Sequence, residues 1–112
     1  MTMPTAPDFY CDEVLSGRTA VNTVVETDDV LAFYHTRPYW AVHIVVIPRR
    51  HIGSLLDLKS EDDPLLLKLI AVVKAVAAQV VAEHSGCRIV TNLGVHQDSQ
   101  HLHWHIGAGE PL

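Results

Sequence analysis

The chain has 112 residues, of which 48% are hydrophobic and 19% charged, and its formal net charge at pH 7 is −5. This composition is typical of a globular domain rather than of a disordered chain. The acidic balance, without a basic cluster, argues against a nucleic-acid partner. We therefore expect a single domain over residues 1–112, large enough to bury its own core.

The start of the chain gives no sign of export. Residues 1–8 are predicted to form a loose arm, because they contain neither a basic leader nor an apolar run of signal length. The most hydrophobic stretch, residues 65–82, is interrupted by two lysines and a glutamine, which argues against a membrane span. Cys11 and Cys87 are too few for a disulfide framework. A cytoplasmic protein without a membrane partner is the expectation.

The predicted elements follow one another without a linker. The sequence predicts a helical turn at residues 12–16, strands at 23–27, 30–34 and 41–47, a helix at 60–86, and strands at 88–92 and 101–106. Pro64 suits the first turn of the helix and Gly86 its C-terminal end. Its predicted apolar stripe consists of Leu66, Leu69, Ile70, Val73, Val76, Val80 and Val81. Strands around one long helix favour an α+β fold with an antiparallel sheet.

Histidine is the unusual residue, since the chain contains eight. His101, His103 and His105 alternate with apolar residues, so on a strand their imidazoles share one face. Groups that titrate near neutrality suit nucleophilic or acid–base catalysis. Alternatively, the row could chelate a divalent metal, with His43 from another strand as a further ligand.

The motif HLHWHIG at residues 101–107 resembles the signature of the histidine triad (HIT) family. The resemblance extends over residues 11–109 and includes the segment VHIVVIPRRH at 42–51. It also includes Asn92, Gly94 and Gln97, in the family's order.

The resemblance implies an α+β fold with a five-stranded antiparallel sheet, one long helix and a short N-terminal helix, often in a homodimer. It also implies cleavage or transfer at the α-phosphate of nucleotides or nucleoside phosphoramidates, with no required cofactor. His103 would be the nucleophile, forming a transient nucleotidyl-histidine. His101 and His105 would orient it, and His43 would complete the cluster. A backbone carbonyl would hold the second N–H of His103.

The small-molecule partner implied by the resemblance is a nucleotide, with a purine nucleoside monophosphate favoured. The predicted substrate-binding residues are Asn92, Gln97, Ser99 and His35. His35 stands where the phosphoramidase branch of the family has an aspartate that binds the ribose.

The loop before the motif, residues 94–100, is two residues shorter than in the family. Asp98 occupies the family's Ser/Thr position and is expected to repel a phosphate unless it is protonated or turned away. The length and charge of this loop leave open whether it supports efficient turnover.

Some relatives bind zinc through two cysteines and two histidines. Here Asp8 replaces the first cysteine, so Asp8, Cys11, His51 and His101 form an alternative zinc site.

Two other function classes stay open at this point. One is a nucleotide-binding or interaction protein that has kept the pocket and lost turnover, which the changes at His35 and Asp98 motivate. The other is a metal-dependent hydrolase that uses the histidine row as ligands.

Overall fold

A five-stranded antiparallel sheet with strand order β1-β2-β3-β5-β4 forms the centre of the molecule. The computed structural model describes residues 8–112, so of the predicted arm at 1–8 only Asp8 lies within the described residues. The strands are β1 (Thr23–Glu26), β2 (Val30–Tyr34), β3 (Trp40–Pro48), β4 (Arg88–Val90) and β5 (Trp104–Pro111). The predicted α+β fold with an antiparallel sheet is confirmed.

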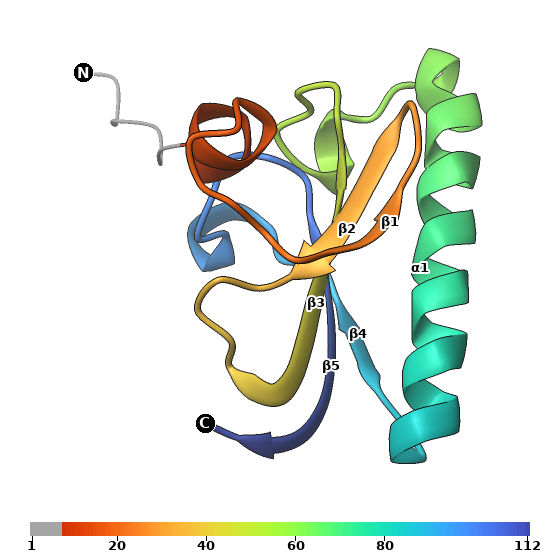
Figure 1. The fold of residues 1–112 in the computed structure, drawn as a ribbon. Helices are drawn as coiled ribbons and strands as arrows, with labels where there is room; N and C mark the ends of the chain where they lie inside the picture. The colour runs from red at the N-terminus through yellow and green to blue at the C-terminus, as the bar shows by residue number, and fades with distance from the viewer. Residues whose placement is uncertain (1–7) are drawn as a thin grey trace.

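Two hydrophobic layers cover the two faces of the sheet. Helix α1 (Asp63–His84) runs along one face, and the helical segment η1 (Tyr10–Leu15) lies on the opposite side (Figure 1). The core under α1 includes Ala32, Ile44 and Trp104. The smaller core under η1 includes Phe33 and Val45, the sequence neighbours of residues in the first core. This alternation follows from the two-residue period of side chains along a strand.

Helix α1 is shorter than predicted at both ends. Residues Ser60–Asp62 form a separate 3-10 turn, η3, in which a carboxylate oxygen of Asp62 accepts the N–H of Lys59 at 2.9 Å. Pro64 then stands in the first turn of α1. The left-handed residue at the C-terminal end is Ser85, with φ 69°, and not the predicted Gly86.

The buried face of α1 consists of Leu69, Val72, Val73, Val76, Ala77 and Val80, which pack on the sheet. Ile70 and Val81 belong to the predicted stripe, but they are exposed. By length and composition alone, Ser60–His84 is apolar enough to cross a membrane. Its packing along the sheet is that of a core helix, which passes the same test.

The central pair of strands, β3 and β5, sets the position of the histidines. Val45 pairs with His105 and His43 pairs with Gly107, so His43 and His105 are diagonal neighbours on one face. Gly107 lies against Trp40, and a Cβ there would come within 2.1 Å of the Trp40 ring. The sheet is therefore closely packed around this pair.

The predicted strand at residues 101–106 is wrong at its start, because β5 begins at Trp104. The amide of Leu102 donates to the carbonyl of Ile52 at 2.6 Å, outside the sheet. Strand β4 ends at Val90 rather than at 92, so it offers no ladder partner before His105. The predicted alternation of histidines and apolar residues between two faces nevertheless holds, because Leu102, like Trp104 and Ile106, packs in the core under α1.

Candidate active site

His103 is held by the backbone of the motif itself. Its Nδ1–H donates to the carbonyl oxygen of His101 at 2.6 Å, as the sequence predicts for the nucleophile. A carbonyl only accepts, so the proton of the neutral ring is on Nδ1 and the lone pair is on Nε2. The ring of Tyr10 packs on His103 with centroids 4.9 Å apart. His103 is buried, and its Nε2 is the nitrogen available for chemistry.

His43 and His105 form a hydrogen-bonded relay beside His103. The amide N–H of Tyr39 donates to Nδ1 of His43 at 3.0 Å, so the proton of that neutral ring is on Nε2. This Nε2–H donates to Nδ1 of His105 at 2.8 Å. His105 must then carry its own proton on Nε2, which is buried and has no hydrogen-bond partner among the described residues.

Burial keeps both rings of this relay neutral. Together with the neighbouring imidazoles, it lowers the pKa of His43 to about 3 and the pKa of His105 to about 4. At neutral pH the unpartnered Nε2–H of His105 is therefore a neutral donor. The ring of His105 lies 4.8 Å from that of His103, centroid to centroid. Such a donor suits an anionic oxygen placed beside His103.

Asp98 faces the same reactive nitrogen. One carboxylate oxygen lies 3.0 Å from Nε2 of His103, and the other accepts the hydroxyl of Tyr39. The hydrogen bond with His103 holds the pKa of Asp98 well below its usual range, although partial burial opposes this. Sequence analysis places Asp98 near the phosphate but misses Tyr39, because no motif or spacing marks it.

A cavity of about 330 Å³ opens next to this group. Its lining comes from η1, from the end of β2 and from the loop before β5, and consists of Phe9, Tyr10, Phe33, His35, Thr36, Arg37, Asp98 and Ser99. The aromatic side chains make one wall, which suits a flat apolar group such as a base. Of these residues, sequence reasoning names only His35, Ser99 and Asp98; aromatic residues at 9 and 10 carry no distinctive signal.

The predicted substrate-binding residues divide into two pairs. His35 and Ser99 line the cavity. The Ser99 hydroxyl accepts the N–H of Phe9 at 3.1 Å. Asn92 and Gln97 are not part of the lining. The Gln97 amide donates to the carbonyls of Gly53 and Ser99, at 2.8 and 3.1 Å, and so ties its loop to the rest of the chain.

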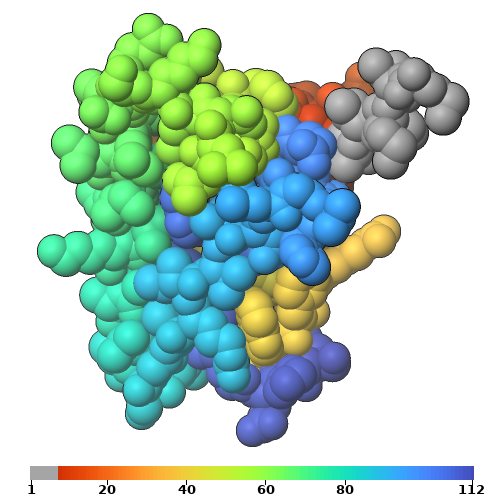
Figure 2. All heavy atoms as spheres, turned by 180° about the vertical axis from the view of Figure 1, so that it is seen from behind, coloured from red at the N-terminus to blue at the C-terminus, as the bar shows by residue number. Residues whose placement is uncertain are grey.

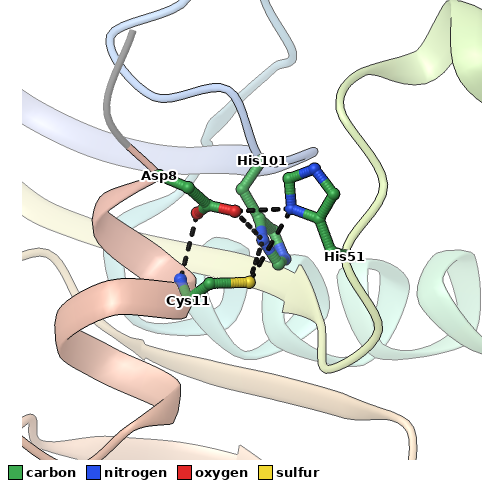
Figure 3. Close-up of side chains that lie close together, drawn as sticks. All are labelled: Asp8, Cys11, His51 and His101. Atoms are coloured by element: carbon green, nitrogen blue, oxygen red, sulfur yellow. Dashed lines mark hydrogen bonds and ion pairs between the residues drawn. The ribbon is translucent and has the colours of Figure 1, made fainter. Parts of the chain in front are cut away.

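His101 points away from this cavity into a second cluster. Its Nε2–H donates to the carbonyl of Pro48 at 2.8 Å, which leaves the Nδ1 lone pair facing Asp8 and Cys11. Figure 3 shows Asp8, Cys11, His51 and His101 turned toward one another. Their candidate ligand atoms all lie within 4.8 Å of one another. Of the motif's three imidazoles, His101 therefore belongs to the second cluster and not to the group around the cavity.

The second cluster has the donor set and spacing of a zinc site. Nδ1 of His101 lies 3.1 Å from Oδ2 of Asp8 and 3.3 Å from Sγ of Cys11, while Nδ1 of His51 lies 2.5 Å from the same carboxylate oxygen. Nδ1 of His101 and Oδ2 of Asp8 are both acceptors, so their contact requires a proton or a metal ion between them. Carboxylate, thiolate and imidazole are all zinc ligands. The residues therefore fit the metal.

The three histidines of the motif do not gather around one position, although candidate ligand atoms lie within 4.8 Å of one another in two groups, His35 with His43 and His105, and Asp98 with His103 and His105. Both ring nitrogens of His101 are used outside the cavity, one by Pro48 and one by the second cluster. The relay that starts at the amide of Tyr39 places a proton on Nε2 of His105, and a protonated nitrogen cannot be a ligand. A metal held by all three motif histidines together therefore does not fit this geometry.

Comparison with known proteins identifies the family of this chain. A family model described as "Scavenger mRNA decapping enzyme C-term binding" matches residues 9–110. A curated HIT-like protein of Synechococcus elongatus is 37% identical over 107 residues, covering 94% of this chain and 93% of its own length. The purine nucleoside phosphoramidase of Escherichia coli K12 is 32% identical over 109 residues, covering 96% and 92%.

Solved structures give the same result. A HIT family hydrolase from Legionella pneumophila superposes with a TM-score of 0.81 at 28% identity, covering 92% of this chain and 93% of that one. A histidine triad protein from Clostridium difficile gives 0.79 at 30% identity, covering 98% and 96%. The fold and these similarities define a HIT family hydrolase/nucleotide-binding fold. The chain belongs to the histidine triad family.

Proposed function

We propose that the protein is a nucleoside phosphoramidase that also accepts related nucleotides, and that it acts through a covalent nucleotidyl-histidine at His103. The observation that supports this best is the state of the two catalytic rings. Nδ1–H of His103 donates to the carbonyl of His101, which leaves Nε2, now in contact with Asp98, as the attacking nitrogen, and His105 has a buried, unpartnered Nε2–H. The similarity to a purine nucleoside phosphoramidase supports the choice of substrate class.

In this mechanism Nε2 of His103 attacks the α-phosphorus while the bond from phosphorus to the leaving nitrogen breaks. That nitrogen keeps the electron pair, takes a proton from solvent and departs as the amine. The Nδ1–H···O bond to the carbonyl of His101 orients the ring and stabilises the positive charge that develops on it. The Nε2–H of His105 donates to a non-bridging phosphate oxygen, and His43 keeps His105 in the required tautomer. Water then cleaves the nucleotidyl-histidine and releases the nucleoside monophosphate. The aromatic wall of the cavity would hold the base.

The test is AMP release from adenosine 5′-phosphoramidate by wild type and by His103→Ala. We expect the variant to fall to the background rate and to form no nucleotidyl adduct by mass spectrometry. His84→Ala, which changes an exposed histidine at the end of α1, is the matched control and should keep full activity. Equal turnover by wild type and His103→Ala would contradict the proposal.

Asp98 favours one alternative function, a nucleotide-binding protein with little turnover. Its carboxylate occupies Nε2 of His103 and is nearly half exposed, so it stands between the nucleophile and an incoming phosphate. Calorimetry with AMP separates the two functions. Tight binding by wild type, without product from the phosphoramidate, would select the binding protein.

We also propose that Asp8, Cys11, His51 and His101 hold a zinc ion. The metal would supply a structural link, because Asp8 and Cys11 belong to the segment that carries Phe9 and Tyr10, two residues that line the cavity. The Nε2–H of His101 bonded to a carbonyl is the outer-shell contact that metal-ligating histidines usually make.

A homodimer through α1 and β4 is a further proposal. Strand β4 lies at an edge of the sheet formed by residues 8–112, so its free backbone groups can pair with the same strand of a second copy. In Figure 2 the end of α1 and the β4 segment adjoin on one face of the molecule. Ile70, Val81 and Ile89 are 43%, 45% and 51% exposed there. Sedimentation equilibrium should give twice the chain mass for wild type and a lower mass for Ile89→Asp.

A further inference from the structure

The lining of the 330 Å³ cavity has three chemically different parts. The first is the aromatic wall, which consists of Phe9, Tyr10 and Phe33. The second is the loop before β5, where Asp98 contacts Nε2 of His103. The third is the segment 35–37, which follows β2. A nucleotide with its base on the aromatic wall and its 5′-phosphate beside His103 leaves its sugar to meet residues 35–37.

His35 continues the pairing of β2 with β3 by one residue. Tyr34, just before it, pairs with Ile44, and the amide of His35 donates to the carbonyl of His43 at 2.8 Å. The side chains of His35 and His43 are therefore cross-strand neighbours, and their rings stack with centroids 4.3 Å apart and planes at 17°. The ring of His35 also lies 5.8 Å from that of His105, centroid to centroid. His35 thus stands on the same sheet face as the catalytic rings.

The segment 35–37 offers hydrogen-bond donors and a positive charge. The amide N–H of Arg37 donates to Nδ1 of His35 at 2.9 Å, so the neutral ring carries its proton on Nε2. Burial lowers the pKa of His35, which keeps the ring neutral at neutral pH. Arg37 is exposed, and its guanidinium group can only donate. The hydroxyl of Thr36 is the one side-chain oxygen in this segment.

This donor set suits an anionic group on the sugar better than free hydroxyls. A hydroxyl is uncharged and needs an acceptor as well as a donor. The oxygens of a phosphate only accept, and their negative charge pairs with a guanidinium group. Asp98 is the only acidic residue in the lining, and its carboxylate already accepts the hydroxyl of Tyr39.

We propose that this site takes nucleotides whose ribose carries a second phosphate, on the 2′- or the 3′-oxygen, and that His35 and Arg37 select it. The inference rests on the proposed function, because it requires the 5′-phosphate to lie beside His103. It names a narrower substrate class for the same site, namely 5′-phosphoramidates of nucleosides that are also phosphorylated on the sugar.

Calorimetry with AMP, adenosine 2′,5′-bisphosphate and adenosine 3′,5′-bisphosphate tests this selection. The bisphosphates differ from AMP only by the sugar phosphate, and the two isomers show which oxygen carries it. We expect wild type to bind one of them about 10-fold more tightly than AMP, a modest factor because Arg37 is exposed to solvent. All three ligands are measured on one protein sample, and the ratio of affinities is compared between variants.

Four variants separate the selection from a general effect of charge. His35→Asp replaces the donor by an anion and should reverse the preference, so that AMP binds more tightly. His35→Gln retains an NH₂ donor and should keep most of the wild-type ratio. Arg37→Gln should reduce the ratio to about threefold or less. The control, Arg18→Gln, removes the same charge from an exposed residue outside the lining and should leave the ratio unchanged.

The inference and the proposed function fail in different ways. If wild type binds AMP but neither bisphosphate more tightly, the selection is overturned while the proposed function stands. The same holds if a preference for a bisphosphate persists unchanged in His35→Asp and Arg37→Gln. If wild type binds none of the three nucleotides and releases no AMP from the phosphoramidate, the proposed function is wrong and the selection is lost with it.

Discussion

The Nε2–H of His43 donates to Nδ1 of His105 across 2.8 Å, although the two residues are 62 positions apart in the chain. The contact exists because β3 and β5 pair so that the two side chains are diagonal neighbours on one face. The amide of Tyr39 fixes the direction of the hydrogen bond. A backbone group in the β2–β3 loop thus determines which nitrogen of His105 is the donor.

Replacing His43 should show two separate effects, one on the stability of the fold and one on the rate of catalysis. His43→Leu leaves Nδ1 of His105 and the amide of Tyr39 without partners, which should cost about 1–3 kcal/mol of unfolding free energy. It should also lower kcat for AMP release by up to about 100-fold, because the tautomer of His105 is no longer fixed. Urea unfolding and steady-state kinetics measure the two effects.

His43→Gln is the matched variant, because its amide oxygen can accept from Tyr39 and its NH₂ can donate to His105. It should recover part of both losses. Equal kcat values for the Leu and Gln variants would contradict a relay that acts through hydrogen-bond direction.

The stability of the fold should fall in mild acid. The pKa values of His43 and His105 are lowered to about 3 and about 4, whereas both rings titrate near 6.5 in the unfolded chain. Between these limits the unfolded state binds more protons than the folded state, so the unfolding free energy increases with pH. The contribution is complete above about pH 6.5 and is lost as the pH falls toward 4.

Urea midpoints at pH 7.5, 6 and 5 measure this dependence. His84 and His96 are exposed, so a variant with both replaced by alanine should keep the wild-type slope. His43→Gln should flatten it. A midpoint that stays constant from pH 7.5 to 5 in wild type would refute the assignment of neutral buried rings.

The fold and the facing of the motif's side chains were within reach of sequence reasoning because both depend on short periodic patterns. The alternation of His101, His103 and His105 with apolar residues survives in the structure even though β5 begins only at Trp104. A two-residue period describes any extended backbone. It therefore predicted which face each side chain occupies, but it did not predict where the strand begins.

The direction of His101 and the role of Tyr39 could not be predicted in the same way. His101 turns toward Asp8 and Cys11, about 90 positions earlier in the chain, because Pro48 offers a carbonyl to its other nitrogen. Tyr39 meets Asp98 across 59 positions. Such contacts depend on how loops close over the sheet, and no local sequence pattern predicts them. The zinc alternative was reached only through the resemblance to relatives.

The packing of Gly107 against Trp40 makes a strong prediction for stability. A Cβ at Gly107 would lie 2.1 Å from Cε3 of Trp40, so the ring must move in Gly107→Ala. We expect a loss of about 1–3 kcal/mol in unfolding free energy, measured by urea denaturation. In the control, Gly86→Ala, the added methyl meets nothing within 4 Å, and stability should change little. Equal unfolding free energies for the two variants would mean that this side of the sheet is loosely packed.

Removal of metal should loosen the N-terminal segment from the site. Burial and the neighbouring Asp8 raise the pKa of Cys11 to about 11, so its thiol is protonated at neutral pH until a metal displaces the proton. Protein purified without added metal should contain one zinc per chain by elemental analysis. Chelation should lower its melting temperature by about 5 °C or more.

Two cysteine variants provide the control. Cys11→Ser should lose the zinc. Cys87→Ser should keep it, because Cys87 packs against the core under α1 and is not part of the cluster. Equal zinc content in the two cysteine variants, or a melting temperature that does not respond to the chelator, would exclude the site.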